Sequence, residues 1–76
     1  MVYSGNDALR FAEDRLVKVA VDDVNWEKLY RGRADGSFWL MTYPKSELHG
    51  GGPPRLERID EEAAESFLAR LEGGAS

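Results

Sequence analysis

The sequence has no cysteine and a single histidine, and each scarcity removes a class of protein. Without cysteine the chain has no disulfide framework and no thiolate metal site. Its longest unbroken apolar stretch, 38–41, is far too short to span a membrane. The first residues, MVYSGND, lack the basic region and apolar run of a signal peptide, so we expect a cytoplasmic protein with no membrane partner.

A basic excess is also missing. The chain has 10 Lys and Arg against 14 Asp and Glu, which gives a net charge of −4. Residues 1–56 are balanced, so the whole imbalance falls in residues 57–76. Nucleic-acid binding needs a basic surface to neutralise phosphates, and we therefore expect no nucleic-acid partner. An acidic segment of this kind suits a basic protein partner instead.

What the sequence does contain is enough for one small core. At 76 residues, 42% of them hydrophobic, the chain is too apolar for intrinsic disorder and too short for two domains. We expect a single domain over 1–76, with residues 73–76 (GGAS) as a disordered tail. The oligomeric state is left open.

Residues 6–21 carry two conflicting patterns. Leu9, Ala12 and Leu16 recur at helical spacing, and Asn6 or Asp7 would cap such a helix. The valines at 17, 19 and 21 alternate as they would in a strand. The length of the segment favours an amphipathic helix over one strand, and a strand remains the alternative.

The strongest structural signal is a β-hairpin. Residues 26–31 and 37–43 are rich in aromatics, and Asp35-Gly36 between them suits a tight turn. A two-residue turn there would pair Tyr30 with Met41. One face of this hairpin is then expected to form the core, because base-stacking platforms need a basic groove that this chain lacks. The residues expected on that face are Trp26, Tyr30, Trp39, Met41 and Tyr43.

Two further elements follow the hairpin. Residues 55–59 are expected to add a third strand, and Asp60 to cap a helix over 61–71 with Glu61 and Glu62 in its first turn. The predicted fold class is therefore α+β, a small single domain with an N-terminal helix, an antiparallel hairpin or three-stranded sheet, and a C-terminal helix.

The loop 44–54 (PKSELHGGGPP) invites three chemical interpretations, and none fits well. Ser46, Glu47 and His49 are neighbours, whereas catalytic triads converge from separate parts of a fold. Glu47 and His49 alone are two ligands short of a closed zinc site. The glycines at 50–52 lead into two prolines, whereas a phosphate-binding loop leads into Lys-Ser/Thr. We expect no enzyme activity, no catalytic residues, no metal site and no cofactor.

The most specific signal is the string from residue 25 to residue 54. It resembles the immunity protein 27 family, small bacterial proteins paired with toxins of polymorphic toxin systems. The chain departs from the family pattern at Asn25, at Gly32-Arg33 and at Leu40-Met41. The residues that carry the resemblance are Trp26, Glu27, Leu29, Tyr30, Asp35, Gly36, Trp39, Thr42, Tyr43, Pro44, Ser46, Glu47, Leu48, His49, Gly50, Gly51, Gly52, Pro53 and Pro54.

The resemblance implies an immunity protein that binds and neutralises a cognate toxin by stoichiometric protein–protein inhibition. Many such toxins are nucleases with basic clefts, which suits an acidic inhibitor. The alternative is a small regulatory or adaptor module with no toxin partner. Two surfaces are candidates for the interface. One is the apolar set Leu29, Phe38 and Leu40, which a helix would otherwise cover. The other, which we favour, comprises Asp22, Asp23, Glu27, Glu47, His49, Asp60, Glu61, Glu62 and Glu65.

Overall fold

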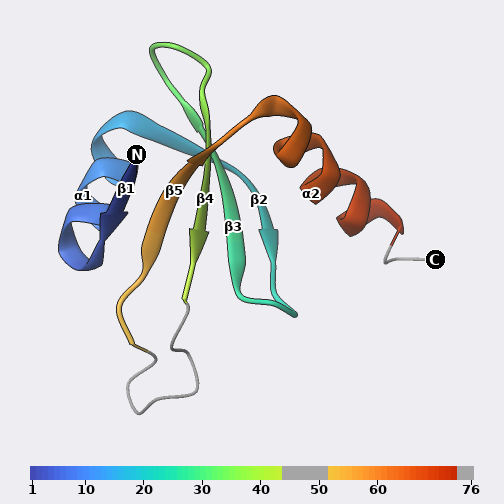
Figure 1. Cartoon of the computed structure of the whole chain (residues 1–76), viewed down its shortest axis with the longest axis horizontal. Coiled ribbons are helices and arrows are strands. Elements are labelled where there is room, and N and C mark those ends of the chain that lie inside the picture. Colours follow the sequence, from blue (N-terminus) through green and yellow to red (C-terminus); the bar gives the residue numbers. More distant parts are fainter. Residues whose placement is uncertain (44–51, 74–76) are drawn as a thin grey trace.

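A computed structural model describes residues 1–43 and 52–73 of the chain (Figure 1). Within those residues it contains five strands and two helices. In chain order they are β1 (Val2–Ser4), α1 (Gly5–Arg15), β2 (Leu16–Asp22), β3 (Glu27–Gly32), β4 (Phe38–Thr42), β5 (Arg55–Ile59) and α2 (Glu61–Gly73).

The strands form one antiparallel sheet in the order β1-β5-β4-β3-β2. β2, β3 and β4 are consecutive in sequence and in space, whereas β5 returns to pair with β4 and then with β1 (Figure 1). The predicted α+β class is confirmed, but the sheet has five strands where a hairpin or three strands were expected. β2 and β1 are the two edges.

Each helix packs on a different face of the sheet. α1 places Ala8 and Ala12 against Trp39, Met41 and Leu56. α2 places Ala64 and Phe67 against Leu29, with Leu40 and Phe38 beside them. Leu40 and Met41 are successive residues of β4, so their side chains point to opposite faces. The apolar patch Leu29, Phe38 and Leu40 is therefore covered by α2, and Leu29 is fully buried.

The predicted helix over 6–21 is wrong in its second half. α1 ends at Arg15, and β2 takes residues 16–22 into the sheet. The carbonyl of Arg15 accepts a hydrogen bond from the Arg33 N–H at 2.9 Å, which joins the chain to the end of β3 where the helix stops. Pairing with β3 satisfies the backbone of a valine-rich segment and overrides the helical spacing.

The start of α1 also differs from expectation. Asn6 and Asp7 lie inside the first turn, because the helix begins one residue earlier, at Gly5. Ser4 is the N-cap residue but its side chain makes no capping bond. The Gly5 N–H is satisfied by the carbonyl of Pro54 at 2.9 Å, so a neighbouring segment does the work of a cap.

The predicted hairpin forms β3 and β4, but its register differs by two residues. Tyr30 pairs with Trp39, and Met41 pairs with Lys28. The cause is the turn, which has four residues, 33–36, closed by a bond from the Gly32 N–H to the Ser37 carbonyl at 2.7 Å. A shift of two preserves the alternation of faces, so Tyr30, Trp39, Met41 and Tyr43 do contribute to one core.

Trp26 is the exception among the predicted core aromatics. It precedes β3 and lies in the turn between β2 and β3, with 64% of its surface exposed. The expectation that it lies in the core was wrong because residues 16–22 form a strand, which makes residues 23–26 a turn.

Part of the glycine-proline motif is described. Gly52 has a φ of 67°, a left-handed conformation that glycine adopts readily, while Pro53 is exposed and Pro54 is buried. Pro44, Gly50 and Gly51 lie outside the described residues, as do residues 74–76 of the predicted tail.

The C-terminal helix agrees closely with expectation. Asp60 caps α2, since its Oδ1 accepts the Ala63 N–H at 2.8 Å. The helix continues to Gly73, two residues beyond the predicted end at 71.

Candidate binding surface

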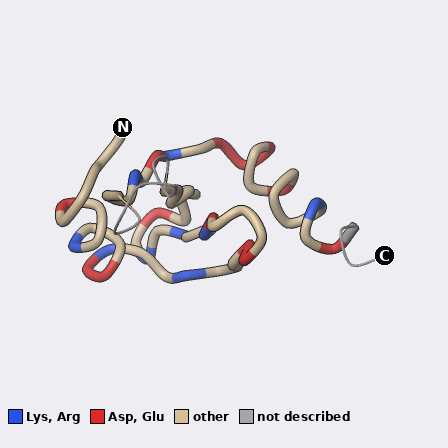
Figure 2. Tube along the Cα trace, turned by 90° about the horizontal axis from the view of Figure 1, so that it is seen from below, with Lys and Arg blue, Asp and Glu red and all other residues tan. Residues whose placement is uncertain are grey.

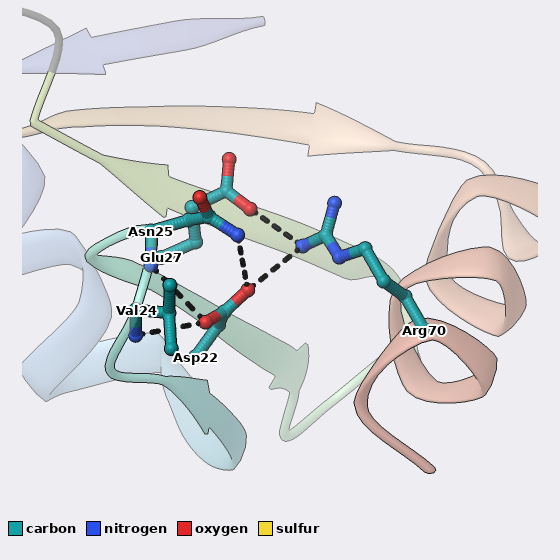
Figure 3. A network of polar contacts seen from close by, with 5 residues as sticks. All are labelled: Asp22, Val24, Asn25, Glu27 and Arg70. Carbon is teal, nitrogen blue, oxygen red and sulfur yellow. Dashed lines mark hydrogen bonds and ion pairs between the residues drawn. The ribbon is translucent and has the colours of Figure 1, made fainter. Parts of the chain in front are cut away.

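The turn between β2 and β3 is organised around one buried carboxylate. Asp22 ends β2 and is only 5% exposed. Its Oδ1 accepts the backbone N–H groups of Val24 at 3.0 Å and Asn25 at 3.1 Å, and its Oδ2 accepts the Asn25 side-chain amide at 2.9 Å (Figure 3). These three bonds fix the path of residues 23–26, which we call the Trp26 turn.

Arg70 connects this turn to the other end of the chain. Its guanidinium Nη2 lies 3.3 Å from Asp22 Oδ2 and 2.7 Å from Glu27 Oε1 (Figure 3). Arg70 is on α2, more than 40 residues away in sequence from both carboxylates. The same guanidinium lies 5.1 Å from the ring of Phe67. Phe67 belongs to the core that α2 forms with the sheet. Arg70 therefore ties the Trp26 turn to the packed face of α2.

The surroundings of Asp22 lower the pKa of its carboxyl group. The largest cause is the hydrogen bond from the Asn25 side chain, followed by that from the Asn25 backbone, and the charge of Arg70 acts in the same direction. Burial opposes these effects but does not outweigh them. Asp22 is therefore ionised at neutral pH, and its carboxylate oxygens bind groups of the protein itself.

Trp26 projects from the end of this turn with its backbone in the left-handed region, at a φ of 57°. Its ring meets Tyr43 edge-on at a centroid distance of 6.4 Å. An open cavity of about 420 Å³ lies beside the two rings. The other residues that line it include Val21, Asp23, Glu27 and Lys28.

The predicted acidic residues fall into two groups. Asp60, Glu61, Glu62 and Glu65 are exposed at the start of α2, and we call them the α2 acidic surface (Figure 2). Asp22 and Glu27 contact Arg70 near the end of the same helix, beside the exposed Asp23. The structure thus brings Asp22, Asp23 and Glu27 together and places them at the opposite end of α2 from the second group.

Two predicted site residues, Glu47 and His49, lie outside the described residues. Across residues 1–43 and 52–73, no three His, Asp or Glu side chains come together as a metal site would require. In the same part of the chain, no helix is long and apolar enough to cross a membrane.

Sequence reasoning missed Arg70 as a partner of the turn and Trp26 as an exposed side chain. Arg70 gave no local signal, because its partners are distant in sequence. The sequence did contain a signal for the turn, because the mostly polar residues 22–25 separate a valine-rich segment from an aromatic-rich one. If residues 16–22 are read as a strand, this signal predicts a hairpin.

Tryptophan and tyrosine, the two rings beside this cavity, are residue types enriched among the hot spots of protein interfaces. The family follows from comparison with known proteins. The family model for immunity protein 27 matches residues 9–60, more than half of the chain, and the chain belongs to this family. The match includes the Trp26 turn and Asp60 but ends before Glu61. The chain has no match among the curated proteins or among the solved structures.

Proposed function

We propose that this protein binds a cognate toxin domain in the cytoplasm and neutralises it by stoichiometric protein–protein inhibition, without catalysis of its own. The family match over residues 9–60 carries the proposal. Because its net charge is −4, the protein is suited to a toxin with a basic substrate cleft, as a nuclease has.

The α2 acidic surface is the part of the protein that we assign to steering the encounter. Its four carboxylates are exposed at one end of a helix, where their field extends into solvent. Exposed carboxylates of this kind mainly raise the association rate, and salt screens them. Glu47 and His49 remain part of the proposed interface.

Growth and binding assays test the proposal. Cells that produce the toxin encoded beside this gene are expected to survive when they also produce this protein, and calorimetry should give a one-to-one complex. A toxin from an unrelated system is the control, which should be neither bound nor neutralised. If the neighbouring toxin is not bound either, the adaptor alternative replaces the immunity function.

The steering role has its own test. The triple variant D60N/E61Q/E62Q should associate with the toxin more slowly and with a weaker dependence on salt, while the helix keeps a cap because asparagine also caps well. D7N/E13Q/D14N changes the same number of charges on α1 and is the matched control. Equal association rates for the two triple variants would remove the α2 acidic surface from the interface.

A further inference from the structure

The two tryptophans of this protein have opposite environments. Trp39 is 3% exposed in the core beneath α1, whereas Trp26 is 64% exposed in the Trp26 turn. A large aromatic side chain contributes to folding when it is buried, so the stability of the core accounts for Trp39 but not for Trp26.

The backbone does not account for Trp26 either. Its φ of 57° is a conformation that a bulky residue seldom adopts and that glycine adopts without cost. At the corresponding last position of the turn between β3 and β4, the chain has Gly36, with a φ of 70°. A strained conformation kept at a non-glycine residue points to a function of its side chain.

The Trp26 turn is also held in advance of any binding. Asp22 fixes the backbone of Val24 and Asn25, and Arg70 fixes Asp22 from α2. A side chain on a rigid turn loses less conformational entropy when it meets a partner than one on a flexible loop. Exposed, rigidly held tryptophans are the type of residue that dominates the binding energy of protein interfaces.

The charges around the ring indicate the chemistry of the partner. Asp23 is the first residue of the Trp26 turn and is exposed, and among the described residues it forms no ion pair. Glu27 lines the same cavity, and its side chain is 23% exposed. The face of an indole ring attracts cations, so the ring and the Asp23 carboxylate favour the same kind of group. Lys28 is directed to Tyr43, with its ammonium 5.9 Å from that ring.

We propose that Trp26 is the central anchor of the toxin interface, and that it receives a cationic side chain of the toxin between its indole ring and the carboxylate of Asp23. This inference rests on the proposed function, since the partner is the cognate toxin. An arginine fits best, because its planar guanidinium stacks on an aromatic face and pairs with a carboxylate. The α2 acidic surface then brings the basic toxin close, and the Trp26 turn holds it.

The first test compares affinities for the toxin domain encoded beside the gene. Trp26→Gly should weaken binding by about 30-fold or more, as expected for a hot-spot residue. Val24→Gly, in the same turn and at an 87% exposed position, should weaken it by less than about fivefold. If Trp26→Gly fails to fold, Trp26→Asn replaces it, because asparagine tolerates the left-handed conformation. Affinity that survives the loss of the ring overturns the proposal.

Fluorinated tryptophan supplies a readout that a purely structural role would not change. In protein labelled with 5-fluorotryptophan, the ¹⁹F signal of Trp26 should shift when the toxin is added, while that of the buried Trp39 should stay in place. Further fluorination of the ring weakens its attraction for cations, so affinity should fall with each added fluorine. Constant affinity across that series would contradict a cationic occupant, and an unshifted Trp26 signal would exclude contact with the ring.

Asp23→Asn completes the test. It should reduce affinity several-fold and weaken the salt dependence of dissociation, whereas Asp14→Asn on α1 should change neither. The two proposals fail in different ways. If the unaltered protein does not bind the toxin, the proposed function is wrong. If it binds and Trp26→Gly binds equally well, the immunity function stands and the anchor is wrong.

Discussion

The turn between β2 and β3 and the turn between β3 and β4 share a backbone plan. Each places four residues between paired strand positions, 22 with 27 and 32 with 37, and each ends on a residue with positive φ. The residue that occupies this last position differs between the two turns. The second turn ends on Gly36, which fits this conformation, and the first ends on Trp26, which does not.

The aspartates of the two turns also have different partners. Asp35 bonds within its own hairpin, because its Oδ1 accepts both the N–H and the hydroxyl of Ser37 at 3.0 and 2.7 Å. Asp22 reaches out of its hairpin to Arg70 on α2. The side-chain bonds of Asp35 thus stay within the second turn and its hairpin, whereas Asp22 links the first turn to a helix distant in sequence, and that turn holds an exposed ring. The comparison suggests that one turn serves the fold and the other serves binding.

Exchanging the last residue of the second turn is expected to have the largest effect on stability. Gly36→Trp imposes a left-handed conformation on a bulky residue and should lower the free energy of unfolding by about 1–3 kcal/mol. Ala34→Trp adds the same bulk to the same turn without a positive φ and should have little effect. Urea denaturation measures the free energy of unfolding of both variants. An equal loss of stability in the two would show that the bulk of the side chain matters rather than φ.

The next effect concerns the side-chain hydrogen bonds of Ser37, which follows the second turn. The Ser37 hydroxyl accepts the indole N–H of Trp39 at 2.8 Å and donates to Asp35. Ser37→Ala removes both bonds and should destabilise the domain by about 1–2 kcal/mol, while Ser37→Thr retains the hydroxyl and should cost less. Thermal melts measure the difference. No difference between alanine and threonine would mean that the hydroxyl does not support the turn.

A smaller effect is expected from Trp26→Gly in the first turn. Relief of the left-handed strain opposes the loss of the Tyr43 contact, and the free energy of unfolding should change by less than about 1 kcal/mol. Chemical denaturation checks it. A large destabilisation would assign Trp26 to the fold and erase the contrast between the two turns.

Lowering the pH is expected to have the smallest effect on stability, and it acts on both turns. Hydrogen bonds from Ser37 lower the pKa of Asp35, as those from Asn25 lower the pKa of Asp22. A carboxyl group with a lowered folded-state pKa stabilises the protein above its unfolded pKa, about 4, and loses that contribution as pH falls through the folded value.

A plot of the free energy of unfolding against pH, from about pH 5 downward, should therefore be less steep for Asp22→Asn and for Asp35→Asn than for the unaltered protein. Salt should change either contribution only a little, since the largest causes at both groups are hydrogen bonds from neutral groups. Curves that keep the slope of the unaltered protein in both variants would remove these two groups from its acid sensitivity.

Local patterns in the sequence predicted the elements that local forces determine. The alternation in β3 and β4 predicted the strands and their faces, and Asp60 before an apolar stripe predicted α2 and its cap. The hairpin register was not predicted, because Asp35-Gly36 suits a two-residue turn, whereas the glycine is the last residue of a four-residue one.

The remaining errors came from long-range contacts. Residues 16–22 fit both the helical spacing and the alternation of a strand, and the pairing of β2 with β3 makes them a strand. The candidate site was predicted through Asp22, Asp23 and Glu27, but as free acidic residues. That two of them bind Arg70 follows from where α2 packs, which no local spacing encodes. The exposure of Trp26 follows from the same strand that sequence reasoning took for a helix.

The outer strand β2 has a consequence for the solubility of this protein. It is an edge of the sheet, and Val17, Val19 and Val21 are 51%, 46% and 37% exposed along it. An apolar edge with free backbone groups is a template on which a second chain can add a strand and begin to aggregate. The register of β2 shifts between Lys18 and Ala20, so the ladder is irregular at Val19. A bulge bends and twists its strand locally, so this edge is a poorer template for a second chain than a flat, regular one.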